Sequence, residues 1–164
     1  MRRILGVDIG GVLRERGLVP IGNYADVPPV DGAFADLRKL GSVFDKIYVI
    51  SKSGLEQQQR KRAWLETQHF SSETQIPLDN VRFCLRKEEK ARLCWELAVT
   101  DFVDNRAEVL SYLGYVRHRY LFRGDPEEIS RFTEVMPYVR CVDSWDELTN
   151  CLIGGRRKTG AARI

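Results

Sequence analysis

The sequence contains no run of about 18 apolar residues, which a transmembrane helix would need, so no membrane span and no membrane partner are expected. The charged Asp8 interrupts the apolar start of the chain, where a secretory signal would need a longer apolar region. We therefore expect a cytoplasmic protein. The net charge of +3 is too small to indicate nucleic-acid binding by itself.

Cysteine and histidine are scarce, and neither is arranged for chemistry. The four cysteines lack C-x-x-C spacing and stand among apolar neighbours, so we expect buried, reduced thiols. The two histidines, His69 and His118, have no partner at the spacing of a metal site or a catalytic triad. A metal or redox site built from these residue types is therefore not expected. The cysteines concerned are Cys84, Cys94, Cys141 and Cys151.

Short apolar runs alternate with amphipathic segments along the 164 residues. This alternation predicts an α/β fold of three layers, Rossmann-like, with a mostly parallel sheet covered on both faces. We expect one domain over residues 1–155 and a basic, flexible tail at 156–164. The predicted strands are 4–7, 47–50, 81–85, 101–104, 119–122 and 139–142. The predicted helices are one ending at Gly41, 55–68, 87–97, one through 109–113, 126–136 and one after Ser144, with a loop at 69–80.

Three tryptophans lie on the predicted helices beside other apolar residues, which favours core packing over ligand stacking. They are Trp64, Trp95 and Trp145.

Polar residues end three of the predicted strands, namely Asp8, Ser51 and Asp104. Ligands of open α/β sheets collect at the carboxyl ends of the strands, so these side chains are expected on one rim. Two carboxylates at one rim are unfavourable unless a cation lies between them. Mg²⁺ prefers carboxylate oxygens and keeps waters that a phosphate can displace, so it is the expected cofactor.

The order of these residues resembles the haloacid dehalogenase (HAD) superfamily. Residues 7–13, VDIGGVL, resemble the first motif, a strand followed by D-x-D-G-[TV], and residues 47–51, IYVIS, resemble the second. Lys90 is the best match to the third-motif lysine, and residues 102–106, FVDNR, resemble the fourth. Each motif alone is weak, but the ordered set is specific. The stretch from Lys90 to Leu110 is also similar to a group of small, uncharacterised HAD-like hydrolases.

The resemblance implies a phosphatase that works through an aspartyl-phosphate. Asp8 corresponds to the family's nucleophile, an instance of carboxylate covalent catalysis. Ser51 corresponds to the residue that hydrogen-bonds a phosphoryl oxygen, and Lys90 to the cation that offsets its charge. Lys87 is the alternative at this position, but helix phase and motif similarity favour Lys90. Lys52 is a further candidate for substrate contact.

The same resemblance implies a Mg²⁺ site. Asp104 would hold the ion together with Asp8 and the backbone carbonyl of Gly10, and Asn105 could support a metal-bound water. An acid is commoner than Asn at that fourth-motif position. Asp101, three residues before Asp104, lies roughly 10 Å away along the strand and is expected to be structural.

The main departure from the family is Gly10, which stands where a second aspartate usually protonates the leaving oxygen and activates water. Such acid–base help is typically worth about 10²–10⁴-fold in rate, so a slow or selective enzyme is expected. Glu15, in the following loop, is a candidate substitute for the missing acid.

No cap domain is expected, because there is no insertion between strand 81–85 and Lys90 and only a flap fits between Val12 and Pro28. In the family, open sites suit large substrates or lids supplied by a partner. The phosphorylated substrate can therefore be small or macromolecular, a phosphoprotein or a nucleic-acid end included, and the oligomeric state stays open.

Two rival functions remain. Gly10 and Asn105 are compatible with a catalytically weakened HAD-fold binding module. Carbon–halogen hydrolysis also uses an aspartate nucleophile, but Asp104 and Asn105 favour a metal site, and the cap that shields such substrates is missing.

Overall fold

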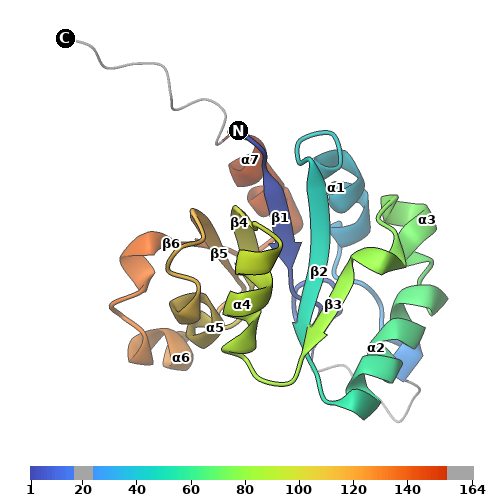
Figure 1. The fold of residues 1–164 in the computed structure, drawn as a ribbon, viewed down its shortest axis with the longest axis horizontal. Helices are drawn as coiled ribbons and strands as arrows, with labels where there is room; N and C mark the ends of the chain where they lie inside the picture. Colours follow the sequence, from blue (N-terminus) through green and yellow to red (C-terminus); the bar gives the residue numbers. More distant parts are fainter. Residues whose placement is uncertain (17–23, 155–164) are drawn as a thin grey trace.

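A six-stranded sheet, in which each strand is parallel to its neighbours, forms the centre of the fold (Figure 1). The computed structural model describes residues 1–16 and 24–154, so the predicted tail lies outside the described residues. The strand order is β3-β2-β1-β4-β5-β6. The strands are β1 (Ile4–Val7), β2 (Lys46–Lys52), β3 (Val81–Cys84), β4 (Asp101–Asp104), β5 (His118–Phe122) and β6 (Val139–Val142).

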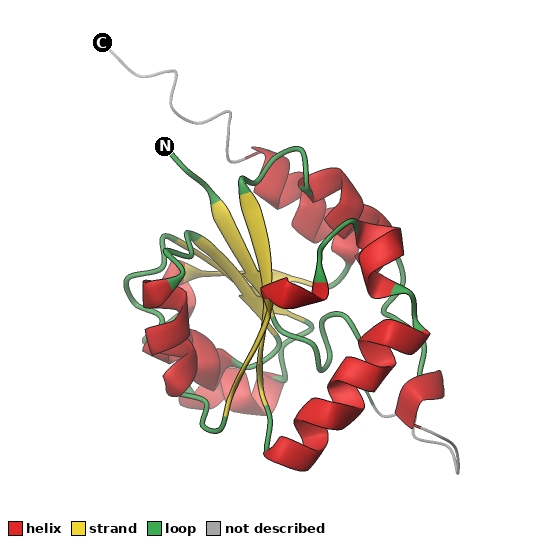
Figure 2. Cartoon of the chain, turned by 45° about the vertical axis from the view of Figure 1, so that its right-hand side comes forward, coloured by secondary structure: helices red, strands yellow, loops and turns green. Residues whose placement is uncertain are grey.

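Helices cover both faces of this sheet and complete the predicted three layers (Figure 2). One layer holds α1 (Ala33–Leu40), α2 (Leu55–Thr67), α3 (Phe70–Thr74) and α7 (Trp145–Gly154). The other layer holds α4 (Glu89–Glu96), α5 (Ala107–Tyr112) and α6 (Pro126–Arg131). Short 3₁₀ helices lie at η1 (Tyr24–Asp26), η2 (Leu78–Asn80) and η3 (Met136–Tyr138). Among the described residues, no helix is both long and apolar enough to cross a bilayer.

Two apolar cores lie on opposite faces of the sheet, because successive strand side chains point to opposite sides. Leu5 and Val7 of β1 pack into the core that also contains Trp64 and Trp145. Ile4 belongs to the second core, under α4 and α5. Burial on both faces explains why the strands read as continuous apolar runs in the sequence.

The sheet reverses its direction of growth between β1 and β4. From β1 the chain builds β2 and β3 on one side, and then returns to place β4 on the other side of β1. Val7 is in register with Val103, and the Asp8 amide donates to the Val103 carbonyl at 3.0 Å. Such a switch point leaves a crevice outside the strand ends, and Asp8 and Asp104 flank it.

One loop prediction and one helix prediction were wrong. The segment 69–80 is not only loop, since α3 forms within it around Phe70, which is fully buried and lies 5.3 Å from the ring centroid of Phe34. The predicted helix 126–136 ends at Arg131, and Phe132 and Met136 both pack against the second core from the turn that follows. Tertiary burial, rather than local helix propensity, decides both segments.

One tryptophan and two cysteines also differ from expectation. Trp95 is 70% exposed and packs edge-on against Tyr115, because Lys90 and Cys94 occupy the buried face of α4. All four cysteines are free, as predicted, but only Cys84 and Cys94 are buried. Trp64 and Trp145 are core residues, as predicted.

The close packing of β1 against β4 gives a stability test. A Cβ at Gly6 would lie 2.5 and 2.8 Å from two ring carbons of Phe102, whereas a Cβ at Gly114 meets nothing within 4 Å. We expect Gly6→Ala to lower the free energy of unfolding by about 1–3 kcal/mol through overpacking. Gly114→Ala, the matched control, should leave it nearly unchanged. Denaturant unfolding measures both, and equal effects would contradict the packing at Gly6.

Candidate active site

A hollow of about 230 Å³ lies at the carboxyl ends of the central strands. It brings together residues from β1, β2, β4 and the helices on both faces of the sheet. All seven residues predicted as site residues line it, namely Asp8, Gly10, Ser51, Lys52, Lys90, Asp104 and Asn105. Its remaining lining residues are Arg16, Lys61, Lys87, Arg106 and Val109.

Lys90 connects the two carboxylates of the hollow. Its Nζ lies 3.0 Å from Asp8 Oδ1 and 2.7 Å from Asp104 Oδ2, and all three side chains are buried. Burial by itself would lower the pKa of Lys90, but the carboxylates of Asp104 and Asp8 outweigh it and raise that pKa. For Asp104 burial acts in the opposite direction and raises the pKa, because it disfavours the charged carboxylate, and Lys90 opposes this shift. The charged ammonium is therefore what allows both acids to lie side by side.

The second oxygens of the two carboxylates differ in their surroundings. Asp104 Oδ1 accepts a hydrogen bond from the backbone amide of Arg106 at 3.0 Å, which fixes that carboxylate. Within residues 1–16 and 24–154, Asp8 accepts no hydrogen bond at Oδ2. Asp8 thus has one oxygen held by Lys90 and one available to a ligand in the hollow.

Oxygen donors for a hard cation lie beside these acids. The Gly10 carbonyl and the Asn105 amide oxygen are of the ligand type that Mg²⁺ prefers. The Asn105 amide nitrogen donates to Gly10 O at 3.1 Å, and its oxygen accepts from Arg16 Nη1 at 2.8 Å. No cluster of three His, Cys, Asp or Glu occurs among the described residues. The candidate set therefore combines two carboxylates with amide and carbonyl oxygens.

Lys61 is a site residue that the sequence analysis missed. It extends from α2, and its Nζ donates to Ser51 Oγ at 2.7 Å and to the Lys52 carbonyl at 3.2 Å. An ammonium group only donates, so the fully buried Ser51 hydroxyl accepts here and keeps its own proton for another acceptor. A signal was present: Lys61 lies three residues before Trp64 and four before Leu65, on the face that α2 turns to the core.

Two alternatives weighed from the sequence can now be placed. Lys87 Nζ pairs with Glu108 at 2.5 Å, so Lys90, and not Lys87, lies between the carboxylates. Glu15 pairs with Arg123 at 3.1 Å and is not among the residues that line the hollow, so the structure gives no support to Glu15 as a substitute acid.

Asp101 lies at the opposite end of β4, as expected of a structural residue. It is fully buried and pairs with Arg3 at 2.8 Å and with His118 Nδ1 at 3.1 Å. His118, for which the sequence indicated no partner, therefore has one.

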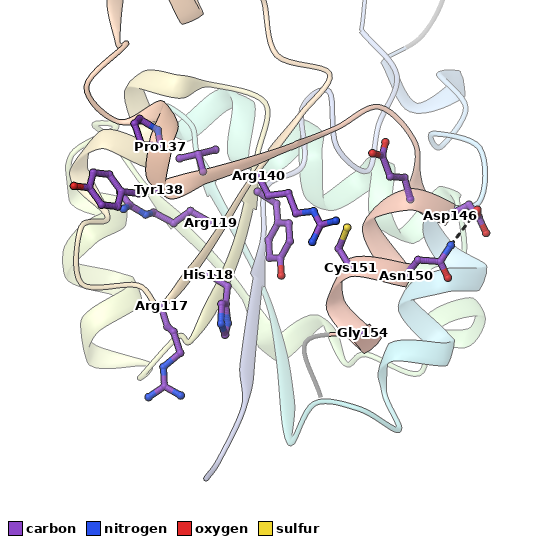
Figure 3. Close-up of a pocket in the computed structure, with 13 residues that line it drawn as sticks. Arg117, His118, Arg119, Pro137, Tyr138, Arg140, Asp146, Asn150, Cys151 and Gly154 are labelled. Carbon is purple, nitrogen blue, oxygen red and sulfur yellow. Dashed lines mark hydrogen bonds between the residues drawn. The ribbon is translucent and has the colours of Figure 1, made fainter. Parts of the chain in front are cut away.

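A larger hollow of about 830 Å³ lies between β5, β6 and α7 (Figure 3). His118 and Arg140 come from the starts of their strands, and Asn150 donates to Asp146 on α7 at 3.3 Å. The hollow is thus at the amino ends of the strands, away from the predicted site residues, and size alone does not identify the functional site.

Comparisons with known proteins show the fold. No protein-family model matches the chain, and no curated protein matches its sequence. The heptose 1,7-bisphosphate phosphatase of B. bronchiseptica, complexed with magnesium and phosphate, aligns with TM-score 0.67 and 12% identity, over 93% of this chain and 99% of that chain. A haloacid dehalogenase-like hydrolase of Burkholderia xenovorans LB400 aligns with TM-score 0.67 and 15% identity. The alignment covers 92% of this chain and 96% of that chain.

A third solved structure is the cobalt-bound deoxy-D-mannose-octulosonate 8-phosphate phosphatase of Haemophilus influenzae. It aligns with TM-score 0.55 and 12% identity, over 96% of this chain and 91% of that chain. The predicted three-layer α/β fold is thereby confirmed: the chain shares its fold with these two phosphatases and with the haloacid dehalogenase-like hydrolase.

Removal of the Lys90 charge tests whether its ammonium group holds the carboxylates of Asp8 and Asp104 together. Lys90→Met leaves two buried carboxylates facing each other, and we expect the free energy of unfolding in metal-free buffer to fall by about 3–5 kcal/mol. Lys87→Met removes a partly exposed pair with Glu108 and should cost less than about 1 kcal/mol. Chemical denaturation of the two variants provides the comparison. Similar losses would show that Lys90 does not hold the acids together.

Proposed function

We propose that the chain is a Mg²⁺-dependent phosphatase of the HAD superfamily, with Asp8 as the nucleophile. The observation that carries this proposal is the sharing of one ammonium by Asp8 and Asp104 at the sheet's switch point. The overall fold, common to the two phosphatases and the HAD-like hydrolase compared above, supports it.

In the proposed reaction Asp8 Oδ2 attacks phosphorus. The new bond joins this oxygen to phosphorus, while the bond from phosphorus to the ester oxygen breaks and the electron pair leaves with that oxygen. Water then attacks the aspartyl-phosphate, which releases phosphate and restores the carboxylate. Ser51 donates a hydrogen bond to a phosphoryl oxygen, and Lys90 offsets negative charge near Asp8. Phosphoryl transfer depends mainly on such positioning and charge stabilisation.

The oxygen donors described above fit a hard divalent cation. Asp8, Asp104, the Gly10 carbonyl and Asn105 would hold Mg²⁺, and the ion would add positive charge beside the transferring phosphoryl group. Two solved structures of this fold, one with magnesium bound and one with cobalt bound, support a divalent metal. Asn105 in place of an acid leaves the site with two carboxylates, so we expect weaker metal binding than a site with three.

Gly10 has no side chain to protonate the leaving oxygen, which is why we propose a slow enzyme. A Cβ at Gly10 would meet nothing within 4 Å, so a side chain can begin at this position without a clash. Gly10 and Asn105 also support the second candidate function, a weakened HAD-fold binding module.

Access to the site bears on the substrate. Only residues 85–88 separate β3 from α4, so no separate cap is inserted there. We propose a phosphorylated substrate, small or macromolecular, handled in the cytoplasm.

Replacement of the nucleophile tests the reaction. Asp8→Asn should abolish release of phosphate from p-nitrophenyl phosphate, because the amide oxygen is a poor nucleophile, and EDTA should abolish wild-type release until Mg²⁺ is restored. Asp146→Asn, an exposed change on α7, is the control and should retain activity. Turnover by Asp8→Asn would remove Asp8 from the mechanism. If the wild-type protein binds Mg²⁺ and phosphate without turnover, the binding module is the better description.

The missing acid makes a prediction about leaving groups. Across aryl and alkyl phosphates, the wild-type rate should fall steeply as the pKa of the leaving alcohol rises, because that alcohol departs unprotonated. Gly10→Asp should raise the rate with alkyl phosphates by about 10²-fold or more and flatten the dependence, since it supplies the acid. Steady-state rates on one substrate series measure both proteins. A flat wild-type dependence would mean that another residue already protonates the leaving group.

A further inference from the structure

Positive side chains outnumber acids around the active-site hollow. Lys90 pairs with both carboxylates of the hollow, Asp8 and Asp104. Two further cations pair with glutamates at its edge: Lys87 with Glu108, and Arg106 with Glu128 at 2.9 Å. The remaining three, which we call the cationic rim, are Arg16, Lys52 and Lys61.

The cationic rim lacks protein anions. Within the described parts of the chain, none of its three side chains forms an ion pair with an acid. They come from three separate segments, namely the loop after β1, the end of β2 and the middle of α2. Convergence of three segments on one hollow differs from a run of charges along one solvated helix face.

Lys61 is the partly buried member of the rim. Burial lowers its pKa, and the charges of Lys90, Arg14 and Lys52 lower it further, while Asp8 opposes them. Arg14 is itself buried, with its guanidinium 3.8 Å from the centroid of the Tyr24 ring. A buried charge that has only a hydroxyl and a carbonyl as partners is stabilised when an anionic ligand arrives.

The negative charges that the proposed reaction brings together are balanced without all three cations of the rim. A phosphoryl group carries about two negative charges. With the two carboxylates it exceeds the positive charge of Lys90 and Mg²⁺ by one, and Lys61 supplies that charge beside Ser51. Arg16 and Lys52 then remain without an anion.

We propose that Arg16 and Lys52 bind a second anionic group of the substrate, a carboxylate or another phosphate, while Lys61 binds the phosphoryl group that is transferred. This assignment rests on the proposed phosphatase function and narrows it. The substrate class is a small phosphate ester with a second negative group. A monophosphate that is otherwise neutral would leave Arg16 and Lys52 unused.

Binding of non-hydrolysable ligands to the whole protein with Mg²⁺ tests this independently of turnover. The probes are ω-phosphonocarboxylates of increasing chain length, each compared by calorimetry with the alkylphosphonate of equal length. We expect at least one length at which the carboxylate improves affinity about tenfold, equivalent to about 1.4 kcal/mol. No preference at any length would overturn the proposal, even if aryl phosphates are hydrolysed normally.

Three variants separate the roles within the rim. The double variant Arg16→Met/Lys52→Met should lose the tenfold preference while its affinity for alkylphosphonates stays the same. Lys61→Met should weaken both members of each pair alike. Arg60→Gln, which removes a charge paired with Glu56 on the same helix, is the control and should behave as wild type. A preference that survives the double variant would overturn the assignment.

A nucleic-acid end is the competing source of a second anionic group. A short oligonucleotide with a terminal phosphonate should bind no more tightly than the best phosphonocarboxylate. Tighter binding would replace the small-molecule assignment with a macromolecular one. If Asp8-dependent turnover fails but the phosphonate preference is present, the phosphatase function falls and the anion site stands.

Discussion

Two carboxylates lie beside each other at the ends of adjacent parallel strands, and the ammonium of Lys90 lies between them. Like charges in a buried place disfavour each other, so this arrangement needs a cation to persist. Because Lys90 is itself buried, it in turn needs both acids. The switch point of the sheet sets the position of Asp8 and Asp104, and α4 sets the position of Lys90. The rest of the candidate site is arranged around this triad.

The two faces of the sheet contribute different halves of the hollow. Lys90 reaches the strand ends from α4, in the helix layer over the second core, and Lys61 reaches them from α2, in the opposite layer. Lys90 contacts the carboxylates of Asp8 and Asp104, whereas Lys61 contacts the hydroxyl of Ser51. A phosphoryl group at the strand ends would therefore lie between two ammonium groups.

The ion pairs around the hollow also bear on which ligands it can bind. Acids at the edge of the hollow pair with Lys87 and Arg106, which keeps those cations structural. Arg16, Lys52 and Lys61 have no acid partner among the residues that the structure describes. Positive potential in a cleft attracts anions before any specific contact forms. The unpaired positive charge of the hollow therefore lies on the side of Ser51 and the loop after β1.

The α/β class, the six strands and the polar residues that end three of them could be read from local sequence patterns. An apolar strand must be buried, and a polar residue at its carboxyl end must lie at the sheet's edge, so Asp8, Ser51 and Asp104 were predictable locally. Tertiary structure decided the rest: the order of strands, the burial of Phe70 in α3, the exposure of Trp95 and the approach of Lys61 to Ser51. These depend on how helices rotate and pack against a sheet assembled from distant segments, and no local pattern of residues specifies that packing.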